Sequence, residues 1–118
     1  MTLEDSAFER KAIINMLNRA GYKDVIEAVD GETGIALYKK EKPDLVLLDL
    51  RLPGMQGMDV FKELKKINRS VKVIVVSIVR KQESIDSAKK VGILGYITKP
   101  ITSAKLLPQV EAAIGKGK

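Results

Sequence analysis

The chain has 118 residues, no cysteine and no tryptophan, and its 21 basic and 15 acidic side chains give a formal net charge of +6. This length suits a single core, so we expect one domain over residues 1–118. The lack of cysteine excludes disulfides and thiolate metal sites. The first residues show no leader pattern, and no apolar run approaches the ~20 residues of a membrane span, so we expect a cytoplasmic protein without membrane contact.

The positive charge is spread along the chain. Basic pairs occur at residues 39–40, 65–66, 80–81 and 89–90, in segments that we expect to lie in different helices or loops. Aromatic residues make up only 4% of the chain, so few side chains could stack on bases. We interpret the charge as solvated helix faces and expect no direct nucleic-acid binding; an acidic partner or a nucleic acid is the alternative.

Short apolar runs alternate with helical patterns along the chain. This alternation is typical of a parallel sheet covered by helices on both faces. The expected strands are a short apolar start before Glu4, followed by residues 25–28, 45–48, 71–76 and 94–97.

Two capping signals define the first helices. Ser6 and Glu9 form a capping box, in which each side chain accepts a backbone N–H from the other residue, and Gly21 ends the helix that follows. The second helix covers residues 31–41 and must end before Pro43, because the residue before a proline avoids the helical conformation.

Three more helices complete the pattern. They follow the loop 51–57, cover residues 82–91, and begin at Thr102 or Ser103. We expect Pro108 to kink the last helix and residues 114–118 to form a frayed tail. The inward face of the last helix is expected to carry Ala104, Leu107, Val110 and Ile114.

Polar side chains follow the ends of four predicted strands. Asp49 closes the run 45–48, Ser77 follows 71–76, and Lys99 follows the run 94–97 through Thr98. Glu4 and Asp5 follow the short apolar start. Strand ends of one polarity share one edge of a parallel sheet, where open α/β folds bind ligands, so these side chains should converge.

Each of these residues alone has a plainer explanation, such as a capping aspartate, a strand-end hydroxyl or a solvated lysine. Together, a hydroxyl, an ammonium and three acids describe a site for Mg²⁺ and phosphate. Mg²⁺ prefers oxygen ligands and is usually held by one or two carboxylates, phosphate oxygens and water.

The chain resembles the receiver domain of two-component response regulators, especially the stand-alone chemotaxis type, over essentially its whole length. The resemblance rests on four segments: Glu4-Asp5-Ser6, residues 49–57 (DLRLPGMQG), Val75-Val76-Ser77 and residues 95–100 (GYITKP). It implies a flavodoxin-like, doubly wound parallel sheet of five strands in the order 2-1-3-4-5, with helices on both faces.

The resemblance also implies roles for the site residues. Asp49 would accept a phosphoryl group from a histidine kinase or a phosphotransfer protein. Mg²⁺ would bind Asp5, Asp49 and the backbone carbonyl of Arg51, with Glu4 holding it through water. Lys99 would pair with a phosphoryl oxygen. The resemblance also makes the Lys99–Pro100 peptide a candidate cis bond.

Further implied roles concern signal output. Ser77 would donate its hydroxyl to the phosphoryl group and, in moving, let Tyr96 turn from exposed to buried, as a two-state switch. The output surface for a downstream effector would include Lys89, Lys90, Tyr96 and Lys105, whose charge suits an acidic partner.

Two features depart from the family pattern. Ile78 stands where receivers usually carry a small residue, so it should crowd the phosphoryl pocket. Only Met1 to Leu3 precede Glu4, although strands usually have about five or six residues and this one would be central. Three explanations stay open: a short but sufficient strand, a rearranged or strand-swapped homodimer, and a truncated or misassigned start.

Two other functions compete with phosphoryl acceptance. A phosphatase or phosphomutase with an aspartyl nucleophile usually needs a second acid two residues later, and that position is Arg51. A phosphorylation-independent binding scaffold is favoured if the short first strand or Ile78 disables the phosphoryl pocket. If Asp5 is displaced together with the first strand, metal binding is the first function lost.

Overall fold

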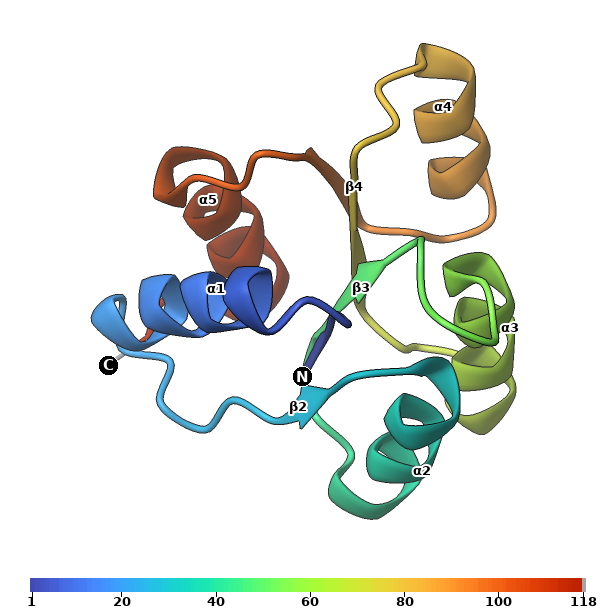
Figure 1. Ribbon diagram of the computed structural model, residues 1–118, viewed down its shortest axis with the longest axis horizontal. Helices are drawn as coiled ribbons and strands as arrows, with labels where there is room; N and C mark the ends of the chain where they lie inside the picture. Colours follow the sequence, from blue (N-terminus) through green and yellow to red (C-terminus); the bar gives the residue numbers. More distant parts are fainter. Residues whose placement is uncertain (118) are drawn as a thin grey trace.

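The computed structural model describes residues 1–117 and has a five-stranded parallel sheet with helices on both faces (Figure 1). The strand order is β2-β1-β3-β4-β5, which confirms the predicted flavodoxin-like topology. The strands are β1 (Thr2–Leu3), β2 (Glu27–Ala28), β3 (Val46–Asp49), β4 (Val73–Ser77) and β5 (Gly95–Thr98). The helices are α1 (Ala7–Arg19), α2 (Gly31–Glu41), α3 (Gly57–Ile67), α4 (Gln82–Lys90) and α5 (Ser103–Ile114).

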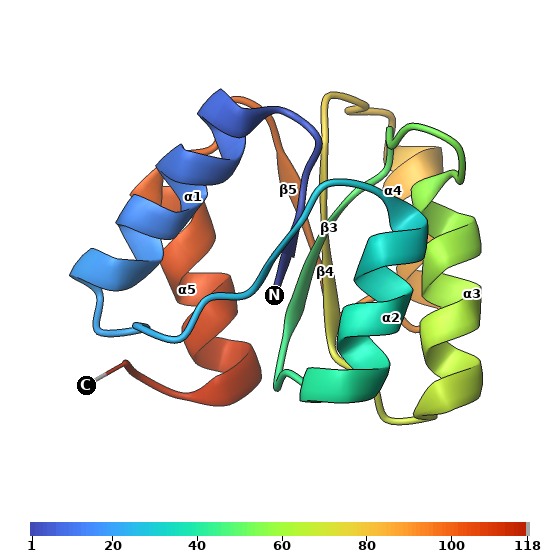
Figure 2. The same ribbon diagram turned by 60° about the horizontal axis from the view of Figure 1, so that its bottom comes forward.

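The helices form two unequal layers. Helices α1 and α5 cover one face of the sheet, and α2, α3 and α4 cover the other (Figure 2). Because both faces are covered, the central strands are apolar at nearly every position. Along β3, Val46 and Leu48 pack on the three-helix side, whereas Leu47 packs on the α1–α5 side.

The first strand is short but fully placed between β2 and β3. Thr2 pairs in register with Glu27 on one side and Leu47 on the other. Hydrogen bonds extend the pairing beyond the two strand residues: the N–H of Glu4 donates to the carbonyl of Ala28 at 3.0 Å, and the N–H of Leu47 donates to that of Met1 at 2.8 Å. Within this single chain, a short strand is therefore sufficient for the predicted topology, and a swapped dimer stays untested.

Helix ends follow the sequence signals closely, with one correction in packing. Helix α2 ends at Glu41, and Lys42 takes a left-handed conformation (φ 46°) before Pro43. Thr102, rather than Ser103, caps α5, which runs continuously through Pro108. In α5 the buried residues are Leu106 and Val110, and Ala104 is exposed.

The predicted tail begins inside α5, since Ile114 is its last residue. The hydroxyl of Tyr22 donates to the carbonyl of Gly115, so the chain just after α5 contacts the segment after α1. Lys118 lies outside the described residues.

Candidate functional site

Asp49 ends β3 at the edge of the sheet where the strands emerge into loops. Its side chain is only 6% exposed. One carboxylate oxygen, Oδ1, accepts the backbone N–H of Arg51 at 2.9 Å, as aspartates commonly do in turns, and Oδ2 accepts from the Lys99 ammonium at 2.9 Å. Each oxygen of the carboxylate thus accepts a hydrogen bond, and the side chain is almost fully buried.

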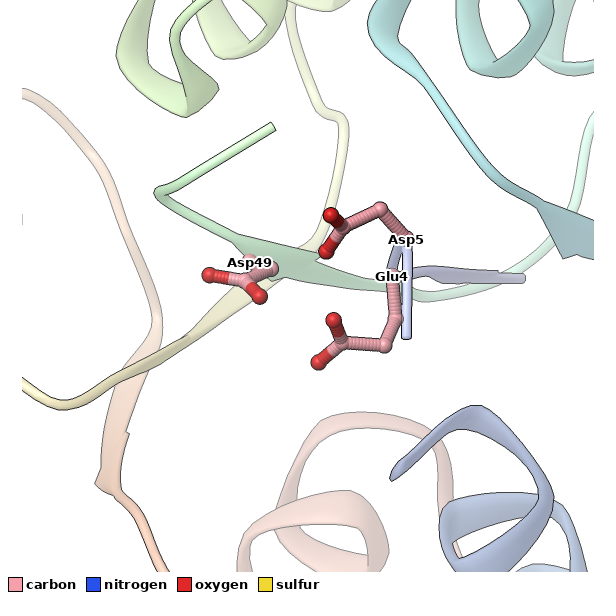
Figure 3. Close-up of side chains that lie close together, drawn as sticks. All are labelled: Glu4, Asp5 and Asp49. Atoms are coloured by element: carbon pink, nitrogen blue, oxygen red, sulfur yellow. The ribbon is translucent and has the colours of Figure 1, made fainter. Parts of the chain in front are cut away.

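Glu4 and Asp5 reach the same place from the end of β1. Figure 3 shows both carboxylates beside that of Asp49, and each of the three residues offers an oxygen within 4.8 Å of the others. Glu4 is buried and Asp5 is exposed. Burial of Glu4, reinforced by its contact with the Asp49 carboxylate, raises its pKa to about 8, although Lys99 and the N–H of Ser6 act against this.

Lys99 is the cation of the site. Its Nζ lies 3.1 Å from Oε1 of Glu4, 2.8 Å from Oε2 of Glu9 and 2.9 Å from Oδ2 of Asp49. Burial by itself lowers the pKa of Lys99, but hydrogen bonds to the three carboxylates outweigh burial and raise it. The Lys99–Pro100 peptide is cis, as predicted.

Glu9 is a member of this cluster that the sequence reasoning missed. The capping box is half correct: Oγ of Ser6 accepts the N–H of Glu9 at 3.3 Å. The Glu9 side chain does not return this bond, because it binds Lys99 instead, and Oε2 of Glu4 accepts the N–H of Ser6 at 3.2 Å. Glu9 and Lys99 are 90 residues apart, so no local sequence signal could reveal the pair.

Ser77 and Tyr96 are joined through the backbone of Val79. Ser77 ends β4, is buried, and accepts the N–H of Val79 on its Oγ at 3.0 Å. The Tyr96 hydroxyl donates to the carbonyl of Val79 at 2.9 Å, and Tyr96 is buried. Tyr96 is thus already buried while Ser77 still contacts Val79, whereas the resemblance implied an exposed Tyr96 before Ser77 moves. Movement of the Ser77 hydroxyl would therefore disturb the residue that holds Tyr96.

The remaining predicted residues lie at the rim or beyond it. Arg51, Lys89, Lys90 and Lys105 are exposed, and Ile78 is half exposed just after β4. The Lys105 ammonium donates to the carbonyls of Thr98 and Pro100, both at 3.2 Å, so it braces the loop after β5.

Arg10 supports the acidic end of β1. Its guanidinium donates to the carbonyl of Glu4 at 2.8 Å and to the Glu27 carboxylate at 2.9 Å. It thus ties the loop that carries Glu4 and Asp5 to β2.

Across residues 1–117, no helix is long and apolar enough to cross a membrane.

The strand order and the acidic cluster at the strand ends place the chain among flavodoxin-like α/β proteins. Residues 1–111 match the response regulator receiver domain family, so the chain belongs to that family. It is 34% identical over 107 residues to the chemotaxis protein CheY of Thermotoga maritima, covering 91% of this chain and 89% of that protein. Receiver domains are signalling modules of two-component systems that bind Mg²⁺ at an acidic pocket and interact with kinases and effectors.

Other relatives extend this picture. The transcriptional regulatory protein PdtaR of Mycobacterium tuberculosis is 31% identical over 113 residues, and the match spans 96% of this chain but only 55% of PdtaR. Among solved structures, CheY in the CheX–CheY–BeF3–Mg complex of Borrelia burgdorferi has a TM-score of 0.89 and 27% identity, covering 94% of this chain and 84% of that one.

Proposed function

We propose that Asp49 accepts a phosphoryl group from a phosphohistidine of a histidine kinase or phosphotransfer protein, and also from small acyl phosphates. The observation that carries this proposal is the nearly buried Asp49 carboxylate, with an ammonium 2.9 Å from one oxygen and two further acids within 4.8 Å. A nucleophile, a cation for phosphoryl oxygens and oxygen ligands for a metal would thus come from the ends of three strands at one edge of the sheet.

The transfer needs no proton from the protein. An Asp49 oxygen attacks phosphorus, the bond from phosphorus to the donor nitrogen or acyl oxygen breaks, and the leaving group takes the electron pair. The product is a mixed anhydride on Asp49, whose remaining oxygen still accepts from the backbone. Lys99 stabilises the negative charge of the phosphoryl oxygens, and Ser77 donates its hydroxyl to one of them after leaving Val79.

The three acids fit a divalent cation. They are hard oxygen ligands, and burial together with the neighbouring Asp49 carboxylate raises the pKa of Glu4, so a cation beside these acids would be stabilising. Asp5, Asp49 and the carbonyl of Arg51 would hold Mg²⁺, with Glu4 acting through water. When bound, Mg²⁺ neutralises repulsion between the carboxylate and the phosphoryl oxygens.

Signal output would follow from the Ser77–Val79–Tyr96 connection. When Ser77 turns toward a phosphoryl group, it gives up the Val79 N–H, and the loop that also accepts from Tyr96 can shift. The surface around α4, β5 and α5, with Lys89, Lys90 and Lys105, would then change its affinity for an acidic effector.

Acetyl phosphate labelling tests the proposal directly. The protein with Mg²⁺ should gain the mass of one phosphoryl group by intact-protein mass spectrometry, and Asp49→Asn should gain none. Beryllofluoride with Mg²⁺, which mimics an aspartyl phosphate, should shift the NMR signals of Ser77 and Tyr96. If the wild-type chain neither labels nor responds to beryllofluoride, the proposal is wrong and a phosphorylation-independent scaffold is the better explanation.

A further inference from the structure

We propose that Glu9 is a positioning residue that occupies Lys99 before phosphoryl transfer and slows the reaction of Asp49 with small anionic phosphodonors. The inference rests on the proposed function of Asp49. It starts from the shortest of the three ion pairs at the site, in which Oε2 of Glu9 lies 2.8 Å from Nζ of Lys99.

The donors of Lys99 are fully used. An ammonium has three hydrogens, and Lys99 directs them at three carboxylates, those of Glu4, Glu9 and Asp49, at 2.8 to 3.1 Å. No hydrogen is therefore left for an oxygen of an arriving phosphoryl group. One carboxylate must release Lys99 before the ammonium can help to bind the phosphodonor.

Glu9 is the carboxylate that can leave at the lowest cost. Its side chain is 38% exposed, whereas those of Glu4 and Asp49 are 2% and 6% exposed. Glu4 also accepts the N–H of Ser6, and Asp49 that of Arg51, so both are held by the backbone as well. A freed Glu9 carboxylate, in contrast, regains water, and water solvates a charge far better than a protein interior does.

Glu9 also places a negative charge directly beside Lys99, the ammonium that an anionic donor would have to reach. Glu9 lies in the first turn of α1, where its backbone N–H donates to Oγ of Ser6. This cap holds the backbone of Glu9 in a place from which its side chain reaches Lys99. The Glu9 carboxylate and the phosphoryl oxygens thus compete for the same ammonium. Removing the Glu9 charge should both free Lys99 and weaken repulsion.

The test is the initial rate of acetyl phosphate labelling with saturating Mg²⁺, followed by intact mass. Glu9→Gln should label about three- to tenfold faster than wild type, the range that Coulomb's law gives for one charge ~6 Å away at an effective dielectric constant of ~40–80. Glu32→Gln is the matched control, because Glu32 is an exposed acid in the first turn of α2. It removes the same charge and should change the rate less than twofold, within about the ordinary scatter of surface substitutions.

Glu9→Asp separates contact from charge. It keeps the carboxylate but shortens the side chain by one methylene, so that the ion pair with Lys99 is lost. If occupation of Lys99 matters, Glu9→Asp should label faster than wild type; if only the charge matters, it should match wild type. The dependence of the rate on donor concentration gives a second readout, since competition for Lys99 acts chiefly on apparent donor affinity, whereas a folding defect lowers the labelled fraction.

Each outcome decides the matter. Faster labelling by Glu9→Gln and Glu9→Asp, with an unchanged Glu32→Gln, supports the inference. Unchanged or slower labelling by Glu9→Gln, with a wild-type chain that does label, overturns the inference and leaves the proposed function of Asp49 intact. Equal acceleration by Glu32→Gln or a wild-type rate for Glu9→Asp reduces the effect to general charge and also overturns it. A wild-type chain that does not label refutes the proposed function and this inference with it.

Discussion

Replacement of Lys99 by methionine should expose the electrostatic conflict that this one ammonium relieves. Lys99→Met keeps an unbranched side chain of similar length but removes all three ion pairs to Glu4, Glu9 and Asp49. Glu4 and Asp49 would then lie buried and close together without a cation. Breaking a buried pair by removing one partner typically costs about 3–5 kcal/mol, because it leaves a charge in the interior without compensation.

Two features of the site reduce this cost. Glu9 is partly exposed and can turn to water. Glu4 can take up a proton, since its pKa is already raised to about 8 in the intact cluster by burial and by Asp49. We therefore expect Lys99→Met to lower the free energy of unfolding by about 2–4 kcal/mol when a chelator removes divalent metal and the pH is about 9, where Glu4 of the wild type is mostly ionised.

The loss should depend on pH in a defined direction. The folded chain keeps a proton on Glu4 between about pH 4.5 and 8 that the unfolded chain has released, so metal-free stability falls as the pH rises through this window. Without the Lys99 ammonium, Glu4 holds its proton more tightly, so the pKa of Glu4 rises further. The loss of unfolding free energy in Lys99→Met should therefore be smaller at pH 6 than at pH 9, by up to about 1.4 kcal/mol, because only the variant keeps the Glu4 proton between pH 8 and pH 9.

Urea unfolding followed by far-ultraviolet circular dichroism measures these free energies, and each kcal/mol should lower the melting temperature by about 3–5 °C. Lys105→Met is the control, since Lys105 is exposed and its ammonium donates to two backbone carbonyls, those of Thr98 and Pro100. Mg²⁺ should recover most of the loss in Lys99→Met but little in the control. A loss below about 1 kcal/mol that does not change with pH would show that the acids are better solvated than their burial implies.

Three further substitutions test other parts of the site. Tyr96→Phe removes the hydroxyl that donates to Val79 and should cost about 0.5–1.5 kcal/mol in urea unfolding; an unchanged free energy would mean that this bond is not populated in solution. Gly57→Ala would bring a Cβ to 2.6 Å from Cα of Leu50 and 2.7 Å from the carbonyl oxygen of Asp49. It should destabilise the chain by about 1–3 kcal/mol and slow labelling, and a wild-type rate and stability would contradict the rigid placement of this loop. Ile78→Ala should speed acetyl phosphate labelling by opening the pocket rim, and equal rates would show that the half-exposed Ile78 does not obstruct it.

The sequence pattern by itself predicted a parallel sheet covered by helices and the place of three polar residues at strand ends, whereas the strand order came from the resemblance to receiver domains. Asp49, Ser77 and Lys99 each follow a recognisable apolar run, and parallel strands bring such ends to one edge. Local signals also placed the Ser6 cap and the end of α2 before Pro43, because capping and backbone sterics act within a few residues.

Only the tertiary structure decided how β1 and α1 contribute. The sequence predicted a short strand before Glu4 but left open whether it could suffice. It is held by backbone bonds to β2 and β3, which come from distant parts of the sequence. The capping rule assigned the Glu9 side chain to the helix end, but an ammonium 90 residues away competes for it more strongly. Charge–charge contacts of this kind depend on which chain segments fold against each other. The sequence shows where the acidic residues are, but only the fold brings Glu9 and Lys99 together.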